Sequence, residues 1–529
     1  MIVTRWSPEE RLQRRLAKAN RRRLRPRWQW WGPFFVLVVV GLGQGLLIKA
    51  IAALIALALI VLVGRRPVGS LAVLIALVPF HQLLFVTLYR FGAPTALVRQ
   101  GIQWKEILII GIFVEGIRRA RAEQHRLDLL DAAGLLYVGL GILYLVIPGF
   151  FVGDAQGSSL DFTTRLLGWR TDVLYVALFL ACRHLRLRPE EMRRLLRVFL
   201  ITATIVAAIG LFEFFFSSTW NRLWIDWIDL PRYKLDILNS DPTVDRVLRT
   251  LDVRVYTAVG GRDVLRIGSV MLDYIALAAY LVIAVALLAD RIVRGVASPR
   301  VHAALAIVGG ALILTETRSS ILAAGVVLVV SLFRRSGHSE AAAAARVRFT
   351  LVLGVIVVLA MPVALGVGLV ARFNGEDTYS SNQSHQNSLD VSYQTLIDHP
   401  LGTGLATAAG AGQRANVTDV TITETEPLQI GVQLGVLGLV LWIWFMLGAV
   451  IIGGRVAGRA PPGPYAGGLT GTRTAVIGLL IGGLLLQNLI DFSVTWSLWA
   501  LAGITLGTVE TMVGRVPAPM SGRRVRIPR

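Results

Sequence analysis

The sequence has 529 residues, of which 54% are hydrophobic and only 16% are charged, and its mean hydropathy is +0.63. These values exclude an ordinary soluble domain and are typical of an integral membrane protein. A net charge of +21 would suggest nucleic acid as a partner of a soluble chain, but the basic residues lie in short runs between apolar segments. That is the pattern of cytoplasmic loops, so we expect no nucleic-acid partner.

The N-terminal arm, residues 1–32, is basic and has no apolar core before a cleavage site, so we expect no cleavable signal peptide. Trp28, Trp30 and Trp31 are typical of an aromatic belt at a membrane surface, and the basic cluster can bind anionic membrane lipids. The single cysteine, Cys182, lies at the end of an apolar run, and we expect it to be a packed residue.

The apolar segments predict an all-α, polytopic bundle of about 12–14 transmembrane helices, since one span needs about 20 apolar residues. The first run is too long for one helix and too short for two full ones, and we interpret it as a tight hairpin. The predicted spans are 33–64 (the hairpin), 68–88, 104–117, 128–148, 171–185, 196–217, 268–289, 301–316, 319–334, 349–370, 428–452, 474–490 and 493–513.

An N-terminus on the cytoplasmic side places every strongly basic run on that side, as the positive-inside pattern requires. The chain then divides into a basic cytoplasmic arm, a bundle, a large exterior loop, the C-terminal spans and a basic cytoplasmic tail. The boundaries are 1–32, 33–370, 371–427, 428–513 and 514–529. Within this scheme, exterior residues 218–267 are expected to lie partly in the membrane interface as an amphipathic helix, and 460–471 to form a flexible cytoplasmic linker.

The exterior loop is the longest polar interruption of the chain. Acidic residues outnumber basic ones there, and HPLGTG at 399–404 forms a proline–glycine pivot. We expect short helices inside the loop. Arginines at the exterior ends of spans are further candidates for chemistry. Arg318 lies between two spans that are joined by almost no loop, and Arg266 lies at the entry of another span, just after Arg254. Guanidinium groups at one level suit a diphosphate, although Arg318 could instead pair with Glu316 or anchor the interface.

The segments RIGSVMLDYIALAAYL, TETRSSILAAG, HPLGTG and PLQIGVQLGVLGLVL occur in this order over about 250–450. Together they resemble the O-antigen ligase and O-antigen polymerase family. The resemblance implies a GT-C-like membrane glycosyltransferase that uses a polyprenyl-diphosphate-linked glycan, such as an undecaprenyl-diphosphate glycan, and a glycan acceptor. A histidine of the family pattern falls on Glu424, where a carboxylate can also accept a hydroxyl proton.

We therefore predict Glu424, Arg318 and Arg266 as catalytic residues. Glu426 and His399 are competing bases. The residues predicted to bind substrate are Arg254, Arg372, His399, Glu426 and Arg170. Asp172 is expected either to line the cleft or to pair with Arg170, whereas Glu213 and Asp273 are expected to face buried arginines.

The favoured function is the joining of glycan units on the outer face of the cytoplasmic membrane, as in polymerases of surface polysaccharides of the cell envelope. One base region opposite a diphosphate predicts inversion, and the sequence requires no cofactor or bound metal. Alternatives are a ligase that transfers glycan to a lipid or protein, a transporter or flippase for lipid-linked glycans, and a structural membrane protein. Other polysaccharide-assembly proteins are possible partners.

Overall fold

The computed structural model describes most of the chain outside the N-terminal arm. The described residues are 57, 61, 65–122, 127–148, 156–240, 242–243, 245–259, 262–333, 379–408, 420–460, 464–489 and 491–515. The chain divides into two units, Met1–Leu59 and Ile60–Arg529, and nearly all described residues lie in the second. Some predictions fall outside the described residues: the span at 349–370, Arg372 and the tail from 516. The hairpin at 33–64 lies almost wholly outside them, since only residues 57 and 61 of it are described.

The described part is almost entirely helical, so the predicted all-α fold is confirmed. The main helices are α4 (Pro67–Leu77), η2 (Val78–Phe80), α5 (His81–Arg90), α6 (Thr95–Gly101), α7 (Trp104–Ala122), α8 (Leu129–Val146), α10 (Gln156–Ser159), α11 (Phe162–Asp172), α12 (Leu174–Leu185), α13 (Pro189–Phe215), α17 (Tyr274–Val293), α18 (Pro299–Leu314), α19 (Arg318–Phe333), α22 (Tyr379–Asp398), α24 (Glu426–Arg459), α25 (Pro464–Gly483) and α26 (Phe492–Arg515).

Six helices of the described part are long and apolar enough to cross a membrane. They are Pro67–Arg90, Leu129–Val146, Pro189–Phe215, Tyr274–Val293, Glu426–Arg459 and Phe492–Gly514, and α12, α18 and α19 are shorter apolar helices. Each coincides with a predicted span. The protein is therefore an all-α polytopic membrane protein.

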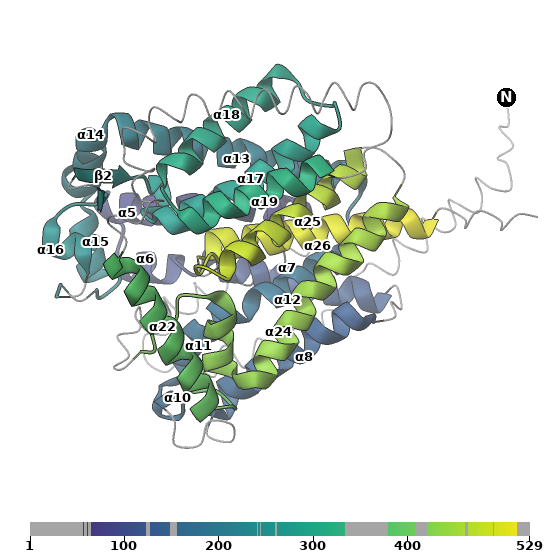
Figure 1. Cartoon of the computed structure of the whole chain (residues 1–529), viewed down its shortest axis with the longest axis horizontal. Helices are drawn as coiled ribbons and strands as arrows, with labels where there is room; N and C mark the ends of the chain where they lie inside the picture. Colours follow the sequence, from purple (N-terminus) through teal and green to yellow (C-terminus); the bar gives the residue numbers. More distant parts are fainter. Residues whose placement is uncertain are drawn as a thin grey trace, which may run out of the picture. The chain divides into compact units, whose positions relative to one another are not determined.

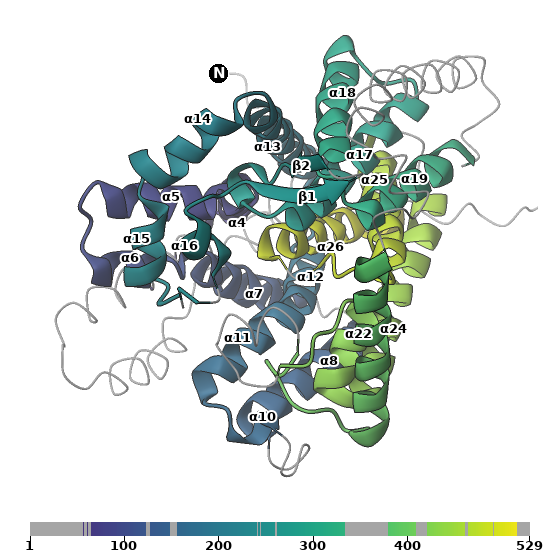
Figure 2. The same cartoon turned by 60° about the vertical axis from the view of Figure 1, so that its left-hand side comes forward.

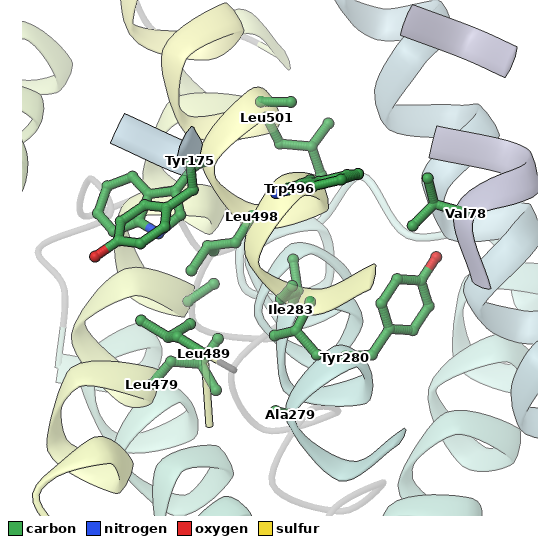
Figure 3. Close-up of a cluster of buried hydrophobic side chains, with 14 of the residues drawn as sticks. Val78, Tyr175, Ala279, Tyr280, Ile283, Leu479, Leu489, Trp496, Leu498 and Leu501 are labelled. Carbon is green, nitrogen blue, oxygen red and sulfur yellow. The ribbon is translucent and has the colours of Figure 1, made fainter. Parts of the chain in front are cut away.

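The core is built around α17 and α26. The most apolar 18-residue stretches of α17 and α26 are 89% and 94% buried inside the protein, whereas that of α24 is only 39% buried. Neighbouring helices therefore surround α17 and α26, while α24 keeps one side exposed to lipid. Figure 3 shows Trp496 and Leu498 of α26 between Tyr175 of α12 and Tyr280 of α17. Close packing of these spans holds the candidate site on a rigid base.

The prediction of a flexible linker at 460–471 is wrong, because α25 already begins at Pro464 rather than at about 474. Its small residues allow close contact with other helices: a Cβ added at Gly468 would lie 2.7 Å from Leu196, and one at Gly471 would lie 2.9 Å from Leu287. Small residues at helix contacts are a feature of membrane bundles, and here they were mistaken for a loop composition.

The segment between α13 and α17 is also not the single amphipathic helix that was expected. It contains α14 (Ser217–Arg222), η3 (Leu223–Trp227), α15 (Leu230–Asp236), α16 (Arg246–Thr250), the hairpin of β1 (Val255–Val259) and β2 (Arg262–Arg266), and η4 (Ser269–Met271). Trp220 and Trp224 are buried and only Trp227 is exposed. The tryptophans therefore mainly anchor the segment to the protein.

Two acidic residues have local structural tasks. The carboxylate of Glu213 accepts hydrogen bonds from the backbone N–H groups of Gly268 (3.0 Å) and Ser269 (2.6 Å). That of Asp273 caps the N-terminus of α17 through Ile275 and Ala276. For Glu213, backbone amides of the described chain thus replace the arginine that we expected, because a turn that enters a span must satisfy its own N–H groups.

Candidate functional site

The large loop is tied to α24 by its helix α22. Figures 1 and 2 both show α22 beside α24, and the two helices are in contact. The hydroxyls of Ser388 and Ser392 on α22 donate to the backbone carbonyl of Ile422, which fixes the strand-like segment that leads to Glu424. The loop therefore carries a long helix, whereas short helices were expected.

The HPLGTG turn lies in a kink of α24. Gly435 has φ +70°, and it divides α24 into Glu426–Leu434 and Val436–Arg459. The hydrogen bonds between turn and kink run from Thr403 N to Val432 O (2.7 Å), from Gly404 N to Gln433 O (3.1 Å) and from Val436 N to Pro400 O (2.9 Å). A Cβ at Gly435 would lie 2.5 Å from the carbonyl oxygen of Pro400, so only glycine allows this approach.

Arg266 holds the turn between α18 and α19. Its guanidinium donates to the carbonyls of Thr315 (3.0 Å) and Glu316 (3.2 Å) and to the hydroxyl of Thr317 (3.3 Å), and it stacks 3.4 Å from the ring centre of Tyr274. Glu316 adopts φ +51°, a conformation that a non-glycine residue rarely adopts, so the turn needs such support.

Arg318 is the residue that this turn presents. It is the first residue of α19, its side chain is exposed, and it makes no hydrogen bond or ion pair with any residue that the structure describes. The expected alternative, a pair with Glu316, is therefore not formed among these residues. An exposed guanidinium at a helix N-terminus can bind an anion from solvent or from a lipid head group.

Residues 482–489, the end of α25 and the segment that follows it, contact the starts of both α19 and α24. The hydroxyl of Ser320 donates to Asn488 Oδ1 (3.3 Å), and Gln487 Nε2 donates to Thr423 Oγ1 (2.6 Å). The N–H of Leu489 donates to the carboxylate of Glu426. One short segment therefore contacts both the element that presents Arg318 and the segment that contains Glu424.

The two carboxylates among the candidate bases differ in accessibility. Glu426, the first residue of α24, is buried, with its carboxylate held by the N–H of Leu489. Glu424 is partly exposed between the buried Thr423 and Thr425. Of these two carboxylates, Glu424 is therefore the one that reaches the surface of the protein.

A buried polar group behind the site was missed from the sequence. Gln429 Nε2 donates to Asp172 Oδ1 (2.6 Å), Tyr137 donates to the carbonyl of Asp172 (2.9 Å), and Gln433 Oε1 accepts from the N–H of Ala406 (2.7 Å). Two glutamines four residues apart on an apolar helix were the available signal. Asp172 is buried and bonded to Gln429, so it neither lines an open cleft nor pairs with Arg170.

Two predicted substrate-binding arginines are paired with acids. Arg170 Nη1 lies 2.8 Å from Glu106, which also lies 3.8 Å from the buried Lys105. Arg254 Nη2 lies 2.7 Å from Asp252. Burial opposes ionisation of Asp252, but its hydrogen bonds with Arg254 prevail and lower its pKa below the usual value.

The hairpin also separates two of the arginines. Val255 is the cross-strand partner of Arg266, so Arg254 lies one register position away, and successive strand residues face opposite sides. His399 is exposed after the end of α22, and its carbonyl accepts from the N–H of Gly402 (2.7 Å). The structure therefore does not gather all the predicted residues around one point.

Fold and site together define a polytopic membrane protein. An exposed arginine begins α19, an acidic segment begins α24, and residues 482–489 contact both helix starts. Within the chain, residues 303–443 match the family model described as O-antigen ligase, which confirms the predicted resemblance to O-antigen ligases and polymerases. The matched region includes most of α18, all of α19 and α22 and the first part of α24, and so Arg318, Glu424 and Glu426. No curated protein matches the chain.

Proposed function

We propose that this protein is a metal-independent, inverting glycosyltransferase that joins glycan units from a polyprenyl-diphosphate-linked donor on the outer face of the cytoplasmic membrane. The observation that carries the proposal is the shared contact of residues 482–489 with α19, which begins at Arg318, and with the segment Thr423–Glu426. Glycosyl transfer of the O-antigen ligase type is the general activity that the family match supports.

In the proposed reaction, the bond between the anomeric carbon and the diphosphate oxygen breaks while an acceptor hydroxyl forms the new glycosidic bond. Negative charge grows on the departing diphosphate. We assign the stabilisation of that charge to Arg318, and such stabilisation is stronger in the transition state than in the ground state.

The acceptor hydroxyl must lose its proton as it attacks. We assign the proton to Glu424, because it is the more accessible of the two candidate carboxylates. Glu426 is the competing base, but its bond to Leu489 gives it a second role in holding the start of α24. A single displacement with one base inverts the anomeric configuration.

Arg266 enters the proposal as a positioning residue, since its guanidinium is used to hold the turn before Arg318. Arg170 and Arg254 contribute positive charge beside acids that partly neutralise it. His399 and Arg372 remain proposed contacts of the glycan, with Arg372 outside the described residues.

A second candidate is a ligase with a lipid or protein acceptor, favoured by the description of the matched family model.

The broken helix α24 is the feature that favours a transporter of lipid-linked glycans, because broken spans are common in transporters. The turn at 400–404 fills this break, which supports a fixed loop rather than a path through the bilayer.

The experiment is incubation of the purified protein with a defined polyprenyl-diphosphate oligosaccharide, followed by mass analysis of the products. Chain growth identifies a polymerase, and transfer only to an added lipid or protein acceptor identifies a ligase. Glu424→Gln should abolish either product while Asp390→Asn, a control in the exposed part of α22, leaves it. Product formation by Glu424→Gln at the wild-type rate would move the base to Glu426 or His399, and absence of any product from the wild type would reject glycosyl transfer.

A further inference from the structure

Helix α22 has an exposed apolar edge. Tyr393 and Ile397 lie four residues apart on it, and Leu401 follows in the HPLGTG turn after the helix has ended. Their side chains are exposed by 62%, 54% and 55%. The neighbouring face of the helix, with Ser388 and Ser392, is buried toward the rest of the loop. The apolar edge therefore continues along one side of α22 and past its end.

A polar row lies beside this edge. Asp390, Gln394 and Asp398 are exposed at spacings of four residues, and Gln394 Nε2 donates to Asp398 (3.0 Å). Residues four apart occupy the same side of a helix, so this polar row runs lengthwise beside the apolar edge, with the exposed Val391 on its other side.

The apolar edge is continuous with the exposed side of the membrane span that follows. Leu401 lies beside Gly435, and the N–H of Val436 bonds to Pro400, which brings the end of the edge to the start of the second part of α24. From there, exposed apolar side chains continue along α24 at helical spacing: Val436, Leu437, Val440, Trp444, Leu447 and Ile451. Figure 2 shows α22 beside this helix.

We propose that α22 lies in the surface of the membrane, with Tyr393, Ile397 and Leu401 in contact with lipid acyl chains and with its polar row among the head groups. The span α24 must expose its apolar row to lipid. The apolar edge of α22 is continuous with that row, so we expect lipid to cover it as well. A helix with separate apolar and polar sides and low overall hydrophobicity is suited to this boundary, and tyrosine is enriched there. The inference is independent of the reaction proposed above.

The test is a nitroxide scan of the full-length protein in vesicles of phosphatidylethanolamine and phosphatidylglycerol. Single cysteines replace Tyr393, Ile397 and Gln394, with Leu437→Cys as the reference for lipid contact. The native Cys182 is fully buried, so labelling of the unsubstituted protein measures the background. Relaxation by oxygen, which concentrates in lipid, is compared with relaxation by a water-soluble nickel chelate.

We expect labels at 393 and 397 to resemble the label at 437, with a severalfold higher ratio of oxygen to nickel accessibility than the label at 394. A higher nickel accessibility at 393 and 397 would place α22 in water and overturn the proposal. Low accessibility to both agents would also overturn it, because it would indicate a protein partner on this edge. All substituted side chains are exposed, and gel filtration of each variant checks that the fold is retained.

Discussion

Two arginines with similar sequence contexts have different environments in the structure. Arg318 is exposed and unbonded to the described residues, whereas Arg266 makes three hydrogen bonds to the Thr315–Thr317 turn and stacks on Tyr274. Arg318 is therefore suited to contact a substrate and Arg266 to hold the element that presents it.

Arg318→Ala should lower kcat/KM about 10²–10³-fold, since that is the usual effect of removing one group that stabilises developing negative charge. Its melting temperature in detergent should equal that of the wild type because the side chain is exposed. Arg300→Ala, which removes an exposed arginine at the other end of the α18–α19 pair, is the matched control and should keep full activity. Equal activity of both variants would exclude Arg318 from the site.

Arg266→Ala should reduce both stability and activity. Loss of hydrogen bonds from a charged group typically costs about 1.5–3 kcal/mol each before the remaining structure adjusts, and Glu316 would lose the contact that supports its backbone. Arg266→Lys should not restore the wild-type melting temperature, because an ammonium group cannot reproduce the planar fork. Thermal denaturation combined with the glycan assay checks this; lost activity with an unchanged melting temperature would instead assign Arg266 to substrate contact.

At the scale of elements, three close approaches of backbone shape the loop. Gly402, Gly404 and Gly435 all have φ between +70° and +104°, and the first and third meet at the kink of α24. Tyr144 of α8 also donates to the carbonyl of Leu401, so α8 and α24 hold the turn from two sides. The large loop is therefore fixed to the membrane bundle at its centre.

Gly435→Ala should destabilise the protein by at least about 1–3 kcal/mol, the usual cost of a strained backbone conformation, because the new Cβ would also meet Pro400 and Leu401. Limited proteolysis should then cut near residues 400–404 faster than in the wild type. Gly325→Ala is the control: among the described residues, no atom outside the backbone of α19 itself lies within 4 Å of the added Cβ, and removal of a glycine from a helix should stabilise it by about 0.5–1 kcal/mol. If both variants resist protease equally, the turn does not depend on the kink.

The positions of the described spans could be predicted from hydrophobicity, because length and apolar content decide whether a segment crosses a membrane. The start of α25 could not, since its glycines and Pro464 have the composition of a linker and only the partners Leu196 and Leu287 make them helix contacts. The ion pairs of Arg170 and Arg254 could not be predicted from the sequence either. The first depends on Glu106 in another helix, and the second depends on the local turn at Asp252. The exposure of Arg318 could be predicted, because the loop between its two helices is too short to cover the side chain.

At the scale of the molecule, the two ends of the helical bundle carry different polar groups. At one end, Arg183 binds Asp128, Asp131 and Glu510 and so joins α12, α8 and α26. At the other end lie the α18–α19 turn and the start of α24. The predicted orientation assigns the first end to the cytoplasm and the second to the exterior.

This orientation predicts the labelling of single cysteines in intact cells. A cysteine at His399 should react with a membrane-impermeant maleimide, whereas one at Ser298, exposed before α18, should react only after permeabilisation. The predicted orientation puts these two positions on opposite sides of the bilayer, so they should never label together in intact cells. The reverse pattern would place the large loop in the cytoplasm and rule out a reaction on the outer face.

The contact of residues 482–489 with both α19 and α24 has a consequence for biosynthesis. The segment is translated after the helices that it joins, so a growing polypeptide inserts Arg318 and Glu424 before this segment can link them. We expect a nascent chain to be inert toward lipid-linked sugars until α25 and residues 482–489 have been added, which would delay the first turnover to a late stage of assembly.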